Sequence, residues 1–154
     1  MGASSDPHDL ARFVAAQDAV IDAVRRELGD GRKRTHGMWF VFPQVEGFGS
    51  SSMARRYAIG SLAEARAYLA HPLLGARLRE CCALVMRHHG ADASTIVGSL
   101  DALKLRSSMT LFAGIAEDGE PFDAVLDAFF GGETCGVTRG VLEVWGAGTQ
   151  HRGA

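Results

Sequence analysis

Apolar residues recur at three- and four-residue steps between Asp9 and Leu28, and this spacing places them on one face of an amphipathic helix. Gly29 and Gly31 follow and end the helical pattern. Because a helix with one apolar face must bury that face against another element, the segment predicts a packed helical domain. The residues of this face are Leu10, Phe13, Val14, Val20, Ile21, Val24 and Leu28.

Further helices are marked by the residues that begin or end them. Ser61 and Glu64 have the spacing of a capping box, which opens a short helix through Leu69. Pro72 fits the first turn of the next helix. The aromatic run "MWFVFP" instead favours an extended segment that ends at Pro43. The remaining predicted helices are "PLLGARLRECCALVMRHH", "SLDALKLRSSMTLFAGI", "PFDAVLDAFFGG" and a short last one from Val137 to Trp145.

These elements predict an all-α fold, in which one compact domain contains five to six helices and at most one short extended segment. A chain of 154 residues is long enough to bury a core of its own, so one domain is the default. We expect a flexible N-terminus over residues 1–8, the helical domain over residues 9–146, and a flexible C-terminus over residues 147–154.

Composition and charge exclude several classes of partner. Apolar residues make up 47% and charged residues 22% of the chain, which is an ordinary globular balance. The formal net charge of −2 gives no overall positive field for nucleic acid or an anionic membrane, and no apolar run reaches the length of a membrane span. The three cysteines lack the spacing of a disulfide framework. We therefore expect a cytoplasmic protein that binds neither nucleic acid nor membrane, while its oligomeric state stays open.

The segment from Thr35 to Tyr57 combines aromatic, glycine and hydroxyl residues that suit a ligand site. In "GFGSSSMARR", glycines free the backbone amides, three serines follow, and Arg55 adds a positive charge that suits phosphate. The lysine of a P-loop is missing, however, and the same residues suit a flexible surface loop that leads into a helix. Gln44 has two interpretations as well, because its amide can bind the edge of a base or sugar, or satisfy backbone groups of the loop. Trp39 likewise suits a ligand wall or the core.

A second group of polar residues lies in "DALKLRSSMT". Asp101, Lys104 and Ser108 are spaced so that they share one face of a helix. Asp101 with Lys104 is a candidate acid–base pair, and Lys104 with Ser107 or Ser108 is a candidate base–nucleophile pair. The alternative is an exposed helical ion pair that contributes roughly a few tenths of a kcal/mol. No histidine pair has the helical spacing of a metalloprotease, so we predict no metal; His36, between a basic turn and the aromatic run, is the most suggestive histidine.

Several long motifs occur in the same order as in an uncharacterised bacterial family, domain of unknown function family 1810, which the chain resembles. The resemblance implies a mainly α-helical single domain, no established activity, and a site built from polar residues that packing alone would not demand. Gly37 stands where the family usually has tryptophan, and the family usually carries an acidic residue near Cys135. The motifs are "DLARFVAAQ", "ELGDGRKRTHGMWFVFPQ", "GFGSSSMARRYAIGSLAEARAYLAHPLLGARL" and "DALKLRSSMTLFAG".

Two shorter stretches, "YAIGSLAEA" and "VWGAG", look similar to pieces of the NAD- and ADP-ribose-associated family, whose members are linked to N-glycosidic chemistry on ribosylated bases. We predict a pocket for a phosphorylated or ribose-containing small molecule between the two polar segments, with N-glycosidic hydrolysis as the reaction to test and no cofactor. The candidate catalytic residues are Lys104, Asp101 and Glu64, and the candidate ligand-binding residues are Trp39, Gln44, Ser50, Arg55, Tyr57, His36 and Ser108.

A different interpretation needs no ligand. The same polar residues then form a buried hydrogen-bond network in a structural or protein-interaction module. Nucleic-acid binding is a third and weaker hypothesis, because acidic residues elsewhere offset the charge of the basic residues that would carry it. These basic residues are Arg25, Arg26, Arg32, Lys33, Arg34, Arg55 and Arg56.

Overall fold

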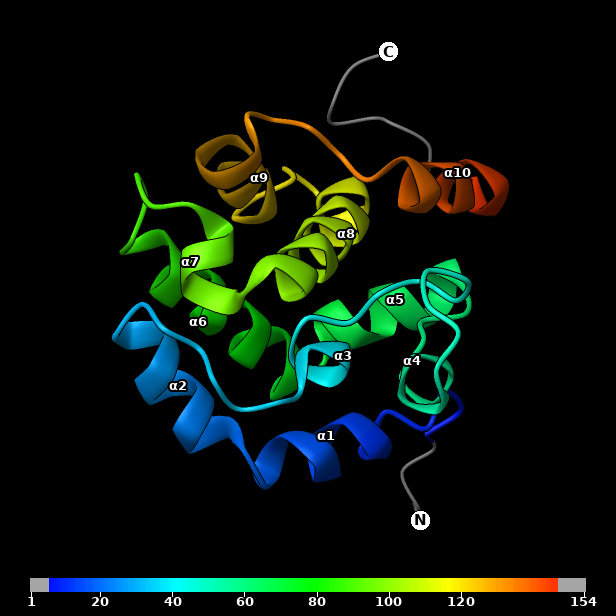
Figure 1. Cartoon of the computed structure of the whole chain (residues 1–154). Coiled ribbons are helices and arrows are strands. Elements are labelled where there is room, and N and C mark those ends of the chain that lie inside the picture. The colour runs from blue at the N-terminus through cyan, green and yellow to red at the C-terminus, as the bar shows by residue number, and fades with distance from the viewer. Residues whose placement is uncertain (1–5, 147–154) are drawn as a thin grey trace.

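The computed structural model describes residues 6–146 (Figure 1). The predicted flexible C-terminus, residues 147–154, lies outside the described residues, as do residues 1–5 of the predicted N-terminal segment. Residues 6–146 form ten α-helices and no strand longer than an isolated bridge, so the all-α prediction is confirmed. The predicted five to six helices are an undercount. Within the same range, no helix is both long and apolar enough to cross a membrane.

The helices follow one another with short connections. Their bounds are α1 Ala11–Asp18, α2 Ile21–Gly29, α3 Met38–Val41, α4 Ser52–Arg56, α5 Leu62–Ala70, α6 Leu74–Met86, α7 Ala93–Val97, α8 Ser99–Ile115, α9 Phe122–Phe130 and α10 Gly136–Trp145.

Helix α8 lies at the centre of the fold. It contacts α3, α5, α7, α9 and α10, and Figure 1 shows it between α9 and α10 on one side and α1 and α2 on the other. A row of aromatic rings crosses the core through this helix. The ring of Tyr68 lies 5.0 Å from Phe13 and 5.5 Å from Phe112, and Phe112 lies 5.6 Å from Phe122. This row joins α1, α5, α8 and α9 into one core, because rings packed at such distances stabilise each other beyond their burial.

The segment predicted as one helix from Asp9 to Leu28 is two helices, α1 and α2. Val20 leaves the helical region with φ −128° and ψ −9°, which interrupts the backbone ladder after α1. The interruption has a reason in the packing, since α1 packs on α3 whereas α2 packs on α6. One straight helix does not reach both partners.

The run "MWFVFP" was predicted to be extended and is instead the helical turn α3, Met38–Val41. Helix α3 packs against both α1 and α8, and this packing, not strand pairing, buries Phe40 and Val41, while Trp39 is half-buried. An extended contact does occur just after it, where Val45 forms a parallel bridge with Ile59. The helices α4 and α7 have five residues each, which is too short for an apolar repeat to mark them.

Several of the predicted helix signals from Ser61 onward are confirmed, but Pro72 is not in the first turn of α6, because α6 begins at Leu74 and Leu73 is its N-cap. The Ser61 hydroxyl accepts a hydrogen bond from the Glu64 backbone amide at 3.1 Å, as a capping box requires. Gly131 ends α9 with the left-handed φ of 61° that favours glycine. The segment "SLDALKLRSSMTLFAGI" is α8 from its first residue to its last.

Two helical glycines provide a test of this packing. A Cβ at Gly75 would lie 2.2 Å from the Leu69 carbonyl oxygen, whereas a Cβ at Gly140 meets no atom within 4 Å. We expect Gly75→Ala to lower the free energy of unfolding by about 2 kcal/mol, because the backbone at the α5–α6 junction must move. Gly140→Ala should raise it by up to about 1 kcal/mol, because alanine is the better helix former. Urea denaturation measures the free energy of unfolding of both variants. An equal change in the two would contradict the close approach of Gly75 to the Leu69 carbonyl oxygen.

The buried cysteines give a second test. Burial raises the pKa of the Cys81 thiol to about 12 and raises that of Cys82 further, and Cys135 is 5% exposed. A thiolate is the reactive form, so we expect none of the three thiols to react with a disulfide reagent in the native protein at pH 8. All three should react in guanidinium chloride. A rapid native reaction at any one of them would show that this part of the core opens readily.

Candidate functional site

Two lysines, one aspartate and one tryptophan meet where α3 packs on the N-terminal half of α8. The Lys104 ammonium lies 3.1 Å from Asp101 Oδ1 and 4.5 Å from the centre of the Trp39 ring. The Lys33 ammonium lies 3.7 Å from Asp101 Oδ2. We call these four residues the lysine–tryptophan site. Asp101 and Lys104 come together as the helical spacing predicts, and Trp39 joins them from the other predicted segment.

Local backbone structure holds each side chain of this site. Gly98, with a φ of 91°, links α7 to α8 and places Asp101 in the first turn of α8. The Lys33 amide donates to the Ile96 carbonyl at 2.6 Å, which fixes the connection after α2 against α7, and its ammonium donates to the Thr35 carbonyl. A Cβ at Gly49 would lie 2.6 Å from the Trp39 ring, so glycine is needed there to let the loop contact that ring.

The site carries an excess of positive charge over its own carboxylate. Two ammonium groups share Asp101, and the Lys33 side chain is only 2% exposed. Burial lowers the pKa of Lys33, although Asp101 and Glu27 act in the opposite direction. The oxygens of Glu27 already accept hydrogen bonds from the Arg34 amide and from the amide and hydroxyl of Thr35. Of the two ammonium groups that share Asp101, that of Lys104 belongs to the more exposed side chain.

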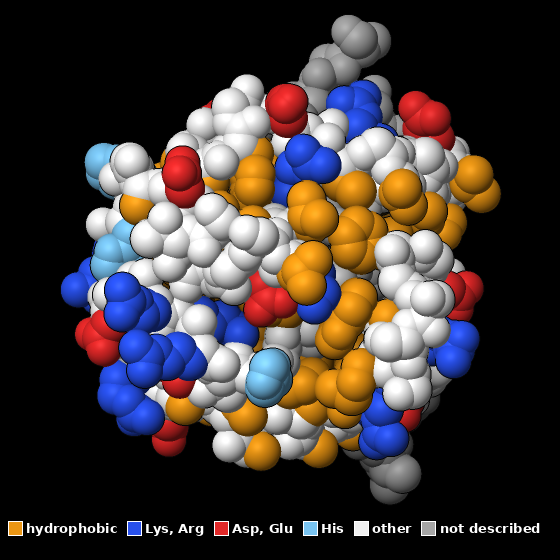
Figure 2. Space-filling model, viewed as in Figure 1, with side chains coloured by type: hydrophobic (Ala, Val, Ile, Leu, Met, Phe, Trp, Pro, Cys, Tyr) orange, Lys and Arg blue, Asp and Glu red, His pale blue; other side chains and the backbone are white. Residues whose placement is uncertain are grey.

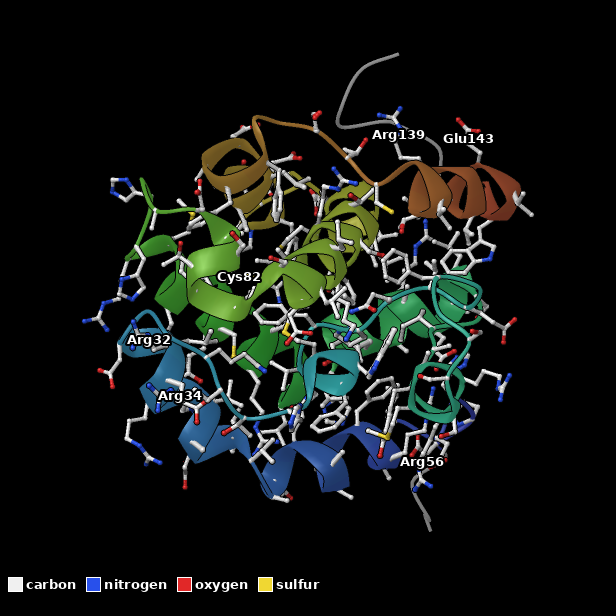
Figure 3. The ribbon with its side chains drawn as sticks, in the orientation of Figure 1. Arg32, Arg34, Arg56, Cys82, Arg139 and Glu143 are labelled. Atoms are coloured by element: carbon white, nitrogen blue, oxygen red, sulfur yellow. The ribbon has the colours of Figure 1, made fainter. Side chains whose placement is uncertain are left out.

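The surface around the site is apolar. Leu100 and Leu103, which flank Asp101 on α8, are 76% and 51% exposed. Figure 2 shows a band of hydrophobic side chains down the middle of this face, with basic side chains gathered at its edge on the side of α2. Arg32 and Arg34, which precede and follow Lys33, are exposed on that edge (Figure 3). Only the middle residue of this basic turn is buried.

Two predicted ligand-binding residues are buried with an unpaired polar atom. Ser108 is 0% exposed and Gln44 is 2% exposed. Neither Ser108 Oγ nor Gln44 Oε1 has a hydrogen-bond partner among residues 6–146, whereas the Gln44 amide nitrogen donates to the Phe42 carbonyl at 2.5 Å. The hydroxyl of Ser107, by contrast, bonds that of Thr138 at 2.8 Å. Buried polar atoms are usually paired, and among residues 6–146 Arg77 Nε and Arg106 Nε are exceptions as well.

Glu64, the third candidate catalytic residue, belongs to a different cluster. Its carboxylate accepts hydrogen bonds from the Arg12 guanidinium and from the Gly60 amide, each at 2.8 Å. Arg12 also donates to the backbone carbonyls of Arg56 and Ala58. This pair ties α1 to the start of α5, in a surface depression of ≈ 580 Å³ that Arg55 also lines. Within the described residues, the polar contacts of Glu64 include neither Asp101 nor Lys104.

The other predicted ligand-binding residues are spread over the surface and the core. His36, Ser50 and Arg55 are exposed. Tyr57 is 8% exposed, and its ring lies 5.8 Å from Phe13 and 5.1 Å from Phe40, so it contributes to the core. The structure therefore groups Trp39, Asp101 and Lys104, and it does not bring Glu64 to them.

Sequence reasoning names Lys33 only among the basic residues that could contact nucleic acid and does not assign it to the site, although a signal for it is present. The chain has only two lysines, Lys33 and Lys104, against fourteen arginines, so both of its lysines meet at Asp101. Lysine carries a compact charge whose pKa shifts readily on burial, and arginine does not. The presence of lysine, and not arginine, at both positions beside Asp101 is therefore a signal of a chemical role. No comparable signal marks Arg12, since it is one of many arginines in the chain.

The Glu64 cluster makes a prediction about stability. Replacement of Glu64 by glutamine removes the charge that Arg12 and Gly60 bind, so we expect the free energy of unfolding to fall by about 1–3 kcal/mol. The matched control is Glu143→Gln, because Glu143 is exposed on α10 (Figure 3) and should change stability little. Urea titration of both variants measures the difference, and a Glu64→Gln protein as stable as the parent would contradict a structural role.

Comparison of the chain with known proteins identifies a family. The family model described as "Protein of unknown function (DUF1810)" matches residues 7–142. The chain is similar to the conserved hypothetical protein Rv1873 from Mycobacterium tuberculosis, whose crystal structure it matches with 51% identity and a TM-score of 0.87, over 90% of this chain and 99% of that one. No curated protein matches. Because the family model covers most of its length, the chain belongs to the DUF1810 family.

Proposed function

We propose that the lysine–tryptophan site binds a small anionic molecule that carries phosphate or ribose. The observation that carries this proposal is the sharing of one carboxylate by two ammonium groups, one of them buried and the other on the face of Trp39. A structural ion pair needs only one cation. The second ammonium is therefore available to an anionic ligand, and ammonium groups are well suited to bind phosphate.

The surroundings support a ligand with an apolar or ring-shaped part as well as a charge. Trp39 offers an aromatic wall, and the exposed Leu100 and Leu103 extend it along α8. Ligand sites are commonly apolar with a few polar groups that fix orientation, and this combination fits that description. His36 and Ser50 stay predictions as residues that contact the ligand from the rim.

The reaction that we propose is hydrolysis of an N-glycosidic bond. Asp101 accepts a proton from water while the water oxygen bonds to the anomeric carbon, and the bond from that carbon to the base nitrogen breaks with its electron pair on nitrogen. Lys104 donates a proton to that nitrogen. The proton on Asp101 then returns to Lys104 across their 3.1 Å contact, so the sugar gains a hydroxyl, the base gains a hydrogen, and both residues regain their starting forms.

A structural function remains the second candidate, and it accounts well for another part of the polar signature. Gln17, which is 1% exposed, donates to the Phe40 carbonyl at 2.7 Å and to the Tyr68 hydroxyl at 2.9 Å. Together with the Arg12–Glu64 pair, it fixes α1 to α3 and α5. These groups are paired inside the protein, so they support a network that fixes the fold. Asp101 and Lys104 differ from them because their side chains are 26% and 21% exposed.

The binding proposal is tested by thermal shift with ADP-ribose and ribose 5-phosphate. We expect each ligand to raise the melting temperature of the parent protein, since a ligand at 100 times its Kd stabilises the native state by about 2.7 kcal/mol. Lys104→Met should abolish the rise. Arg66→Met is the matched control, because Arg66 is an exposed cation on α5, and it should leave the rise unchanged. If neither ligand shifts the parent, the site does not bind this class.

The reaction is tested separately with Asp101→Asn. The parent should release hypoxanthine from inosine 5′-monophosphate, whose leaving nitrogen takes up the proton, as measured by chromatography. The variant should still bind ADP-ribose but release base at least a hundredfold more slowly, because general base catalysis typically contributes 10²–10⁴-fold. If the parent binds ADP-ribose but releases no free base, the protein binds this ligand class without hydrolysing it, and the proposed reaction is wrong.

A further inference from the structure

The lysine–tryptophan site uses lysine in a chain that otherwise relies on arginine. For ion pairing alone arginine serves as well, and the chain uses it in the Arg12–Glu64 and Arg77–Asp18 pairs. The two residue types differ in their chemistry, because a lysine can lose its proton and become a nucleophilic amine, whereas an arginine stays charged in proteins. Lysine at both positions beside Asp101 therefore suits a reaction of the amine itself.

Asp101 is in a position to take the proton from Lys104. The Lys104 ammonium donates a hydrogen bond to Asp101 Oδ1 at 3.1 Å, so the proton moves along an existing contact. The Lys33 ammonium lies 3.7 Å from the other oxygen of the same carboxylate. Burial lowers the pKa of Lys33 most, and the charge of Lys104 lowers it as well, although Asp101 acts in the opposite direction. The two ammonium groups therefore repel each other, which favours the loss of one proton from the pair.

Lys104 is the amine of this pair that a ligand can reach. Its side chain is 21% exposed, whereas that of Lys33 is 2% exposed and its ammonium also donates to the Thr35 carbonyl. The Lys104 ammonium lies 4.5 Å from the centre of the Trp39 ring, and the exposed Leu103 precedes it on α8. Apolar groups around an amine limit the access of water, which protects an intermediate that water would hydrolyse.

We infer that Lys104 forms a covalent imine with the aldehyde of an open-chain sugar, such as that of a ribose phosphate. This inference rests on the proposed function, because it names the form in which the site holds one of its ribose-containing ligands. A ribose with a free anomeric carbon opens to an aldehyde, and a lysine amine reacts with such a carbonyl. An intact nucleotide does not open, since its anomeric carbon is bonded to the base. The covalent adduct therefore forms with the sugar product and not with the substrate of the proposed hydrolysis.

The residues of the site supply every proton transfer that the imine needs. Asp101 accepts a proton from the Lys104 ammonium, and the neutral amine adds its electron pair to the aldehyde carbon while the carbonyl pair moves to oxygen. That oxygen takes a proton from the new nitrogen, which gives a carbinolamine. Asp101 then returns its proton to the hydroxyl, which leaves as water, and the nitrogen electron pair forms the C=N bond. The product is a protonated imine, so a positive charge remains beside the Asp101 carboxylate.

Trapping with cyanoborohydride, followed by peptide mass spectrometry, tests this inference. The reagent transfers hydride to the imine carbon and leaves a stable secondary amine on the lysine that reacted. The parent is incubated with ribose 5-phosphate, and Nα-acetyl-lysine in the same reaction serves as an unperturbed amine. We expect Lys104 to be labelled about tenfold faster than Nα-acetyl-lysine, which corresponds to about 1.4 kcal/mol of barrier. Ribitol 5-phosphate, which has no aldehyde, should give no label.

Two matched variants separate the amine from its charge and from its position. Lys104→Arg keeps a cation beside Asp101 and Trp39 but has no amine that forms an imine. It should still show a rise in melting temperature with ADP-ribose and give no label at this position. Arg66→Lys adds a lysine at an exposed position on α5, and that lysine should be labelled at the rate of Nα-acetyl-lysine.

Failure of this inference is separable from failure of the proposed function. Labelling of Lys104 no faster than that of the lysine introduced by Arg66→Lys, or labelling at Lys33 instead, overturns the inference. If ADP-ribose raises the melting temperature of the parent while Lys104 is not labelled, the inference fails and the proposed binding stands. If neither ADP-ribose nor ribose 5-phosphate binds, the proposed function fails. Glycolaldehyde, which carries no phosphate, then decides the inference: preferential labelling of Lys104 supports the imine, and its absence overturns it.

Discussion

The burial of α8 on nearly all of its sides is the constraint from which the rest of the structure follows. Five other helices contact it, and the aromatic row through Phe112 connects it to α1, α5 and α9. A helix in this position has few faces that reach solvent. Most polar residues on it therefore bond to a neighbouring element or lie near its end, and Ser108 is an exception. Ser107 and Thr110 bond to the start of α10 and the residue before it, and Asp101 and Lys104 lie near the N-terminal end.

The same constraint separates structural polarity from polarity that suits a ligand. Around α1 and α5, each buried charge or amide has protein partners, and Glu64 and Gln17 are bound from two elements each. Near the N-terminal end of α8, two ammonium groups share the carboxylate of Asp101, and in the buried middle of the helix Ser108 keeps an unpaired atom. The two hypotheses for the polar signature are thus both supported, but by different residues.

The sequence predicts the long helices well because their apolar faces and caps are local properties. The capping box of α5, the full extent of α8 and the glycine after α9 all depend on residues within a few positions of one another. Helix α3 is different. It is too short for a repeat, and burial between α1 and α8 overrides the strand preference of its aromatic residues. The contacts of Lys33 with Asp101 and of Arg12 with Glu64 join distant parts of the chain, and no local pattern encodes them.

The scarcity of lysine in this chain has a practical meaning for spectroscopy. Since Lys33 and Lys104 are its only lysines, their ammonium groups and the N-terminal amine are the only aliphatic amines that it carries. Among the side chains, reductive methylation with isotope-labelled formaldehyde would therefore place NMR-visible groups only at Lys33 and Lys104, in the lysine–tryptophan site. The deeply buried Lys33 and the partly exposed Lys104 would react at different rates and give distinct resonances. The two methylated lysines would then report on the surroundings of Asp101, which both ammonium groups contact.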